Sequence, residues 1–414
     1  MKFKSIHLKN ILFGWLIMGL FLSLHSENMY QLPSLLITND GSKITSVRKW
    51  KKYRNEIKKL FEQEVYGISP LLPSKVKFTI EYEDKNIFDG KATKKRVNLY
   101  LGNYANPIEL LIYYPNNYGT KTPAFLGYNF WGNHTVTTDE EIPITSLWVP
   151  NLVDVKQNCA VASMRGIRTG RWPVETIIDA GYALVTLYCG DIDPDYDDGF
   201  KNGVHGLYKD KKYTWGTLAA WSWGLSYVMN YLEKDKRIDS KKVAVIGHSR
   251  LGKAALLAGA FDERFALTIS NNSGCGGAAL SQRKKGERFK DINTHYPHWF
   301  CSNFKKYSDN EDKLKVDQHQ LIAMVAPRPV YVASAELDKW ADPEGEFLSA
   351  CLAGEVYHLY GLKGLEKNET PAVNSPLIDG YVGYHIRTGK HDINEYDWKQ
   401  FIRFANKHLK ENCK

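Results

Sequence analysis

The spacing of hydrophobic residues changes near residue 120, and the two patterns predict two kinds of strand. Before that point, apolar and polar side chains alternate, which is typical of antiparallel strands, at residues 75–84, 94–102 and 108–115. After it, short continuous apolar runs predict buried strands at residues 123–132, 181–191, 241–249, 265–274, 328–336 and 354–361. Helical spacing covers residues 45–67, 214–235, 251–261 and 393–410, and the second of these runs is predicted to be amphipathic.

Apolar strands that alternate with helices are typical of a mostly parallel sheet with helices on both faces. We therefore predict an α/β fold of three layers, with the alternating N-terminal strands as an antiparallel extension. Residues 27–414 are predicted to form one large domain with insertions, because no repeat or low-complexity linker divides them.

The first 26 residues predict a signal peptide. Lys2, Lys4 and Lys9 precede an apolar run at residues 11–24, and the small Ser26 follows it. The run is short for a membrane span, and an uncleaved N-terminal anchor is the alternative. We expect a secreted or periplasmic protein with no membrane span after cleavage.

Composition excludes several functional classes. The formal net charge is +9, but the basic residues are spread along the chain with no arginine-rich block, so we expect no nucleic-acid partner. Six cysteines are too few for a disulfide framework, although one bridge among the middle cysteines is compatible with export. No cysteine and histidine spacing fits a zinc site.

The stretch "VAVIGHSRLGKAALLAGAF" places Ser249 between a predicted strand and a predicted helix. In a parallel sheet the loops at the carboxyl ends of the strands carry the chemistry. Gly247 permits a tight turn there, and the following helix directs its N–H groups at the serine oxygen. We predict that Ser249 is a nucleophile, and a helix N-cap serine is the alternative.

A serine nucleophile needs a histidine base and an acid that orients the base. Asp338 follows a predicted strand, and His391 stands in a loop before the last predicted helix, so both come after Ser249 in the order of α/β-hydrolases. Surface ion pairing or helix capping is the alternative for Asp338. Rival histidines, expected to pack or to shape the pocket, are His248, His298 and His385.

The motif "GHSRLGK" departs from the common G-x-S-x-G pattern, because Leu251 fills the second glycine position and Gly252 comes one residue later. In this form it resembles the signature of the glucuronoyl esterases, carbohydrate esterase family fifteen. Further segments resemble the bacterial members of that family, at residues 273–289, 295–307, 326–347 and 383–398. The resemblance spans about residues 120–410 and implies an α/β-hydrolase fold.

The resemblance leaves the position of the acid open. Some members carry a glutamate in a segment like "LTIPQESG", but this chain reads "LTISNNSG", with Asn272 at that position. An amide cannot stabilise a histidine cation by charge, so we predict Asp338 as the acid. Glu336 and Asp342 are the alternatives.

The resemblance also implies roles that spacing alone does not give. It implies that the Arg250 guanidinium helps to stabilise the oxyanion, and a surface ion pair is the alternative. The sugar ring would be bound by Lys253, Glu287 and Trp299. Apart from the resemblance, the backbone N–H of Arg250 is an expected oxyanion donor because it follows the nucleophile, and a second N–H is expected from residues 129–134.

Together these features predict a secreted serine esterase that cleaves esters of 4-O-methyl-glucuronic acid on xylan, such as those to lignin alcohols. We expect a monomer that needs neither a metal nor an organic cofactor. One alternative is a carbohydrate deacetylase of the same fold, such as an acetyl-xylan esterase. The other is a carbohydrate-binding protein without activity, which the loss of the acid at Asn272 would favour.

Overall fold

The computed structural model describes residues 32–38, 40–119, 121–152, 157–365 and 369–410. The predicted signal peptide lies outside these residues. Within them, no helix is both long and apolar enough to cross a membrane.

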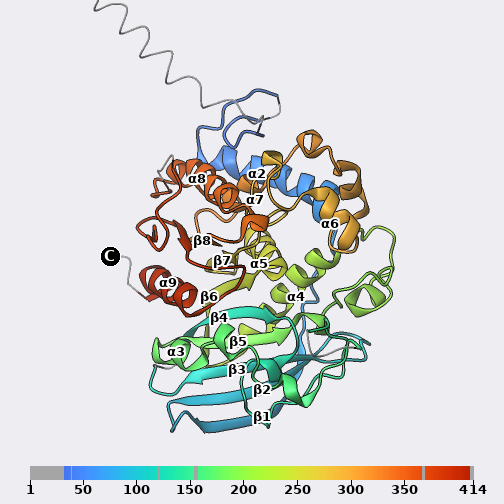
Figure 1. Ribbon diagram of the computed structural model, residues 1–414, viewed down its shortest axis with the longest axis vertical. Coiled ribbons are helices and arrows are strands. Elements are labelled where there is room, and N and C mark those ends of the chain that lie inside the picture. The colour runs from blue at the N-terminus through green and yellow to red at the C-terminus, as the bar shows by residue number, and fades with distance from the viewer. Residues whose placement is uncertain (1–31, 39, 120, 153–156, 366–368, 411–414) are drawn as a thin grey trace, which may run out of the picture.

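A nine-stranded sheet runs through the described part of the chain (Figure 1), in the order β1-β2-β3-β5-β4-β6-β7-β8-β9. The first three strands and β5 pair antiparallel, and the strands from β5 to β9 pair parallel. This confirms the predicted parallel sheet with an antiparallel extension. The strands are β1 (Lys77–Ile87), β2 (Ala92–Tyr100), β3 (Ile108–Pro115), β4 (Thr122–Asn129), β5 (Ala183–Tyr188), β6 (Ile238–His248), β7 (Leu267–Asn271), β8 (Val330–Ala335) and β9 (Val382–Arg387).

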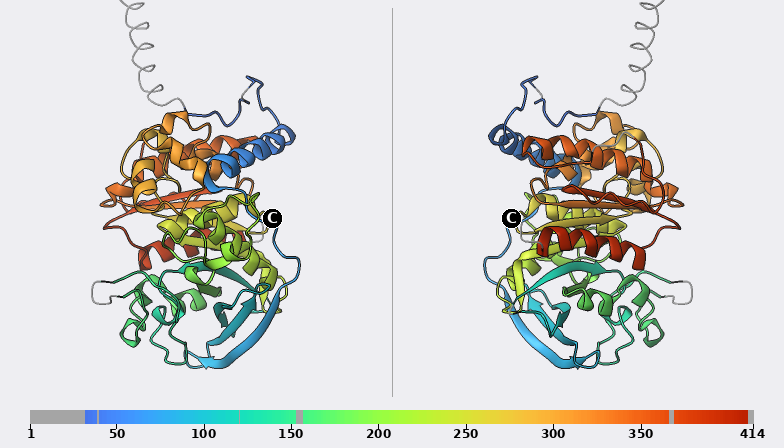
Figure 2. Two further views of the ribbon diagram at one scale, coloured as in Figure 1. Left: turned by 90° about the vertical axis from the view of Figure 1, so that its right-hand side faces the viewer. Right: turned by 90° about the vertical axis from the view of Figure 1, so that its left-hand side faces the viewer.

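Helices cover both faces of the sheet (Figure 2), because the central strands are apolar on both sides. In β6, Val243 and Val245 face one hydrophobic layer, and Ala244 and Ile246 face the other. The first layer holds α2 (Val47–Phe61), α4 (Thr217–Leu232), α5 (Arg250–Phe261), α7 (Gln318–Ala323) and α8 (Pro343–Leu359). The second holds α3 (Val174–Asp179) and α9 (Glu395–Ala405), while α6 (Phe289–His295) lies in the long connection after β7.

Helix α4 differs from its prediction, because it is buried around almost its whole circumference rather than on one face. The segment 67–76 crosses the outer side of α4 and is hydrogen-bonded to it. Trp223 Nε1 donates to the carbonyl of Pro70, and Asn230 Nδ2 donates to that of Pro73, both at 2.9 Å. An outer cover of this kind comes from a distant part of the chain, so the local pattern does not reveal it.

The predicted strand at residues 354–361 is wrong, because this segment forms the end of α8 and the turn after it. Phe347, Ala350 and Ala353 continue the buried stripe of the helix at a spacing of three residues. A short apolar run does not separate a buried helix from a strand. The last strand is β9, whose residues the pattern did not mark as a strand.

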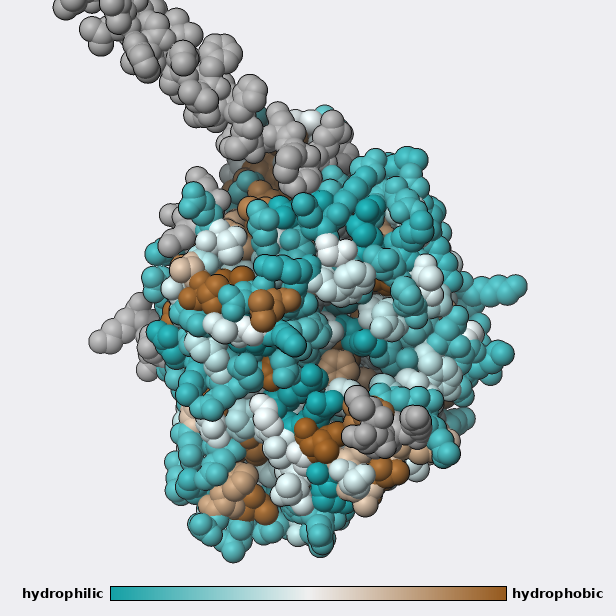
Figure 3. Space-filling model, in the orientation of Figure 1, coloured by the Kyte–Doolittle hydropathy of each residue, from teal (hydrophilic) through white to brown (hydrophobic). Residues whose placement is uncertain are grey.

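Cys159, Cys189, Cys275 and Cys301 are free thiols, so the disulfide that the sequence allows among the middle cysteines does not involve them. The face shown in Figure 3 is mostly hydrophilic, with apolar residues in small separate patches. Two large apolar side chains at the surface, Leu337 and Trp340, are each 57% exposed and follow strand β8.

Candidate active site

Ser249 occupies a strained turn between β6 and α5. Its backbone has φ 57° and ψ −131°, in the region that disfavours residues other than glycine. A Cβ on Gly247 would lie 2.0 Å from the carbonyl oxygen of Leu251, so only glycine fits there. Leu251 itself is buried in the core, which explains how the turn accepts a leucine where most related motifs have glycine. The turn therefore presents the Ser249 side chain at the carboxyl edge of the sheet.

His391 reaches this edge on the loop after β9. Its Nδ1 lies 2.6 Å from Oδ2 of Asp338, and 43% of its side chain is exposed. Arg387 holds the loop in shape by donating to the carbonyls of Lys390 and Asp392, at 3.2 and 2.6 Å. The imidazole is thus fixed at Nδ1 and open on its other side.

Asp338 lies just after β8 and is buried. Burial alone would raise the pKa of its carboxyl, but contacts with His391 and the amide of Asn272 outweigh that effect and lower it. Asn272 Nδ2 donates to the same Oδ2 at 2.9 Å. Asp342, an alternative acid, instead accepts from Arg283 Nε at 2.9 Å.

The rival histidines lie in other surroundings. His385 is buried between the Tyr331 hydroxyl and the Asp397 carboxylate, each 2.9 Å from its ring. His248 packs against the His391 ring, with centroids 4.6 Å apart. Burial, followed by the charges of His391 and Arg171, lowers the pKa of His248 far below its usual range, so it is a neutral neighbour of His391.

Arg250 is held beside Ser249 by an acid that the sequence analysis missed. Its Nη1 donates to Asp195 Oδ2 at 2.6 Å, and its guanidinium lies beside the rings of Tyr296 and Trp299, 4.8 and 4.6 Å from their centroids. Asp195 also accepts from Trp299 Nε1 at 2.8 Å and is 3.2 Å from His298 Nε2. Burial opposes ionisation of Asp195, but Arg250 and these donors lower its pKa to about 2.

Lys253 forms a second buried ion pair, one helical turn after Ser249. Its Nζ lies 2.9 Å from Glu287 Oε2, donates to the Cys275 carbonyl, and stands 5.6 Å from the centroid of Trp299. Tyr296 stacks flat on Trp299, with centroids 3.9 Å apart and planes 4° apart. A cation, a carboxylate and an aromatic face therefore adjoin one another.

A cavity of about 520 Å³ joins these groups. It is lined by all seven residues that the sequence analysis selected, namely Ser249, Arg250, Lys253, Glu287, Trp299, Asp338 and His391. Tyr296 and Trp340 also line it, and Asp195 lies behind Arg250; none of these three was predicted from the sequence. Asp195 had a signal, because it stands in an acidic loop directly after a predicted strand, where parallel sheets carry their chemistry.

The lining suits an acyl compound with a polar ring. Ser249 offers a hydroxyl, His391 a proton acceptor, Arg250 a cation, and Lys253 with Glu287 offers donors and acceptors for hydroxyl groups. Among the described residues, no cluster of three or more histidine, cysteine or acidic side chains could hold a metal ion.

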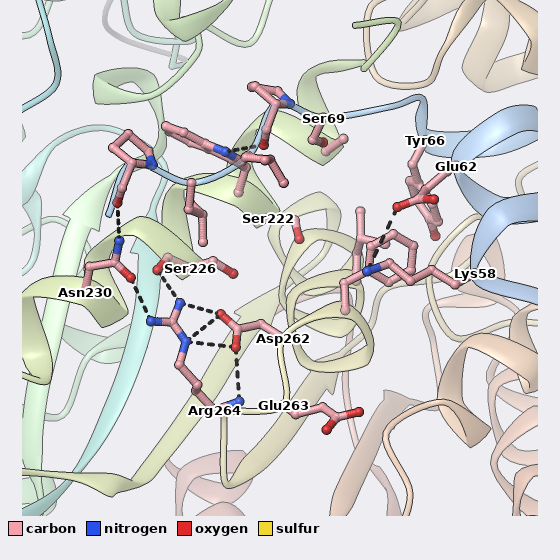
Figure 4. Close-up of a pocket in the computed structure, with 18 of the residues that line it drawn as sticks. Lys58, Glu62, Tyr66, Ser69, Ser222, Ser226, Asn230, Asp262, Glu263 and Arg264 are labelled. Carbon is pink, nitrogen blue, oxygen red and sulfur yellow. Dashed lines mark hydrogen bonds and ion pairs between the residues drawn. The ribbon is translucent and has the colours of Figure 1, made fainter. Parts of the chain in front are cut away.

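A larger cavity, of about 600 Å³, lies near the far end of α5 from Ser249 (Figure 4). Several of its polar side chains contact one another. Arg264 contacts Asp262 at 2.7 Å and Asn230 Oδ1 at 2.7 Å, and Lys58 lies 4.0 Å from Glu62. This cavity contains neither Ser249 nor His391.

Glu346 of α8 supports the loop behind the cavity. Its carboxyl accepts the N–H groups of Ser273 and Gly274, at 2.8 and 2.9 Å, and lies 2.6 Å from Ser334 Oγ. Complete burial raises the pKa of Glu346 to about 8, and the nearby Asp338 carboxylate adds to the rise. The group is therefore protonated at neutral pH, next to an ionised Asp338.

Comparisons with known proteins find related esterases. The family model described as "Glucuronyl esterase, fungi" matches residues 157–361. Carbohydrate esterase MZ0003, from an unknown prokaryotic organism, is 48% identical over 391 residues, which cover 92% of this chain and 90% of that protein. The solved glucuronoyl esterase from Solibacter usitatus superposes with a TM-score of 0.87 at 43% identity, covering 92% of this chain and 98% of its own.

A more distant relative is 4-O-methyl-glucuronoyl methylesterase 1 of Wolfiporia cocos. It is 36% identical over 191 residues, which cover 43% of this chain and 46% of the relative. The matched part thus spans about half the length of that protein.

Because Glu346 is buried, we predict that the free energy of unfolding falls as pH rises. An unfolded glutamate loses its proton near 4.5, but the folded one keeps it up to about 8. Between these values the folded state binds more protons than the unfolded state. Glu346 therefore lowers the free energy of unfolding by up to about 1.4 kcal/mol for each pH unit of increase. Glu346→Gln should flatten this dependence in urea unfolding measured from pH 5 to pH 8. Glu395→Gln, at an exposed site, is the control, and an unchanged slope in Glu346→Gln would contradict the assignment.

Proposed function

Because the chain belongs to the glucuronoyl esterases, carbohydrate esterase family fifteen, we propose that it hydrolyses esters of glucuronic acid with Ser249 as the nucleophile. One observation carries the proposal. The cavity that contains Ser249 is lined both by the hydrogen-bonded pair of His391 and Asp338 and by the ion pair of Lys253 and Glu287. The first pair suits ester cleavage, and the second suits a hydroxylated ring.

The proposed reaction has two steps. His391 Nε2 accepts the Ser249 proton while Oγ attacks the ester carbonyl, and it then gives that proton to the departing alcohol. Water next attacks the glucuronoyl-serine ester with the same help, which frees the uronic acid and restores Ser249. Asp338 keeps Nδ1 of His391 protonated and stabilises its cation, and the 2.6 Å contact supports this role.

Arg250 is proposed to stabilise the negative oxygen of the tetrahedral intermediate. Its backbone N–H is the first of helix α5, so no earlier helical carbonyl accepts it. Its Nε is buried without a hydrogen-bond partner, which leaves a donor ready for a ligand oxygen. A second N–H from residues 129–134 stays a prediction, and that of Gly132 already donates to Asn129 Oδ1 at 2.8 Å.

Lys253, Glu287 and Trp299 are proposed to bind the uronate ring. The names of relatives such as the Wolfiporia cocos enzyme point to the 4-O-methyl sugar, and we propose that the substrate is this sugar on xylan, esterified to alcohols such as those of lignin. We further propose that residues 1–26 direct export to the periplasm or the exterior and that residues 27–414 act as one monomeric catalytic domain.

The function is tested by comparing the turnover of benzyl glucuronate with the turnover of a simple aryl acetate. The native enzyme should prefer the glucuronate ester, and Ser249→Ala should remove nearly all turnover of it without loss of folding, since members of a triad act as a unit. Preference for the acetate would instead indicate a deacetylase. Substantial turnover by a clean Ser249→Ala preparation would show that the nucleophile lies elsewhere.

The role of Asp338 as the acid is tested by comparing substitutions at Asp338 and at its neighbour Asn272. Asp338→Asn keeps the shape but removes the charge that stabilises the His391 cation, so kcat should fall about 10³- to 10⁴-fold. Asn272→Ala removes one hydrogen bond to that carboxylate, so kcat should fall only about ten- to a hundred-fold. Equal losses in the two variants would mean that Asp338 does not act through its charge.

The ring site is tested by Lys253→Ala. Losing one charged hydrogen bond to sugar hydroxyls should lower kcat/KM for benzyl glucuronate about ten- to a hundred-fold, and much less for the aryl acetate. Lys399→Ala, at an exposed ion pair on α9, is the matched control. If both esters lose activity equally in Lys253→Ala, the lysine supports the structure of the site rather than binding the sugar.

A further inference from the structure

A further cavity, of about 420 Å³, lies at the same edge of the sheet as Ser249. It is bounded by the turn between β2 and β3, the segment before residue 149 and the long loop after β5. Its aromatic lining residues are Tyr104, Trp148 and Tyr196, and its amide side chains are Asn103, Asn106 and Asn202. Its volume is within the usual range for small-molecule sites.

Buried carboxylates hold the walls of this cavity together. Asp191, after β5, accepts the N–H of Glu109 in β3 at 3.0 Å, which fixes the β2–β3 turn against the long loop. Two positions on, Asp193 lies 2.8 Å from His205 Nδ1 and accepts from Thr217 Oγ1 at 2.7 Å. The cavity is therefore part of the folded framework and not a gap between loose loops.

The lining combines aromatic faces with amide and hydroxyl groups, and Lys201 adds one cation. Trp148 and Tyr196 are half-buried, with centroids 4.9 Å apart, and Asn202 Nδ2 donates to the Tyr196 hydroxyl at 3.2 Å. Burial, with the charges of Asp191 and Asp193, raises the pKa of Tyr104 to about 12, so its hydroxyl stays neutral. Aromatic faces bind the C–H side of a sugar, and amides and hydroxyls bind its edge.

One residue separates this cavity from the reaction site. Pro194 and Tyr196 line the cavity, while Asp195 between them holds Arg250 and Trp299 in the catalytic pocket. A chain longer than one sugar, with its ester at Ser249, could therefore extend past Asp195 into the cavity.

We propose that this cavity is a subsite for the neutral sugar chain that carries the uronate ester, an inference that rests on the proposed function. The alcohol is assigned to the opposite side, because His391 must protonate it, and the loop of Asp338 and Trp340 lies there. The three amides favour a hydroxylated chain over an aromatic alcohol as the occupant.

The test compares benzyl glucuronate with a glucuronate ester borne on a β-linked xylo-oligosaccharide. Trp148→Ala and Tyr196→Ala should each raise the KM for the oligosaccharide ester roughly two- to ten-fold relative to the KM for the benzyl ester. Phe78→Ala, an exposed aromatic on β1 that is 38% accessible, is the control and should leave this ratio unchanged. An unchanged ratio in both cavity variants would overturn the proposal.

A binding measurement tests the subsite with a substitution at an exposed position, which should not disturb folding. Unesterified neutral xylo-oligosaccharide is titrated by calorimetry into Ser249→Ala protein, with and without the additional change Asn106→Ala, whose side chain is exposed on a turn. Binding that weakens with Asn106→Ala supports the subsite, and unchanged or absent binding argues against it. If the native enzyme does not cleave benzyl glucuronate at all, the proposed function fails, and the titration still decides whether the cavity binds sugar.

Discussion

The left-handed backbone at Ser249 is the constraint on which the site depends. A residue other than glycine in this conformation is costly, by about 1–3 kcal/mol, and persists only where surrounding packing enforces it. Here β6 is paired on both sides, α5 is buried along most of its length, and Gly247 leaves no space for a side chain. The strain places a hydroxyl, the first N–H of α5 and the Arg250 side chain at one point on the sheet edge.

Around that point, three carboxylates each hold one basic partner in place. Asp338 is paired with His391, Asp195 with Arg250, and Glu287 with Lys253, at 2.6, 2.6 and 2.9 Å respectively. Each carboxylate comes from a loop after a different strand of the parallel sheet. The pairs of Arg250 and Lys253 are buried ion pairs, which contribute little net stability, so their value here is orientation before the substrate arrives. The protonated Glu346 supports the loop after β7 without adding a negative charge next to Asp338.

Sequence reasoning predicted the features that depend on local pattern. The strand, turn and helix around Ser249 are contiguous, so their arrangement could be deduced from one stretch of the chain, and the parallel sheet followed from repeated strand and helix pairs.

Asp195 was missed because its partners, Arg250 and Trp299, are about 55 and 104 positions away in the chain. Helix α4 and the end of α8 were misjudged for a related reason, since the cover that buries α4 comes from residues 67–76 and burial hides the helical period. The place of Lys253, four residues after Ser249 on the same helix face, followed from spacing. The choice of Glu287 followed only from family resemblance, because a lysine and a glutamate 34 residues apart share no local pattern.

The central claim, that Ser249 is an activated nucleophile at this edge, is tested most directly by labelling with a serine-directed fluorophosphonate. The account predicts one label per chain, which mass spectrometry locates on the Ser249 peptide. Esterase activity should be lost in proportion to labelling, and His391→Ala should be labelled slowly. Full activity in the labelled protein, or inactivation by a label on another residue, would contradict the account.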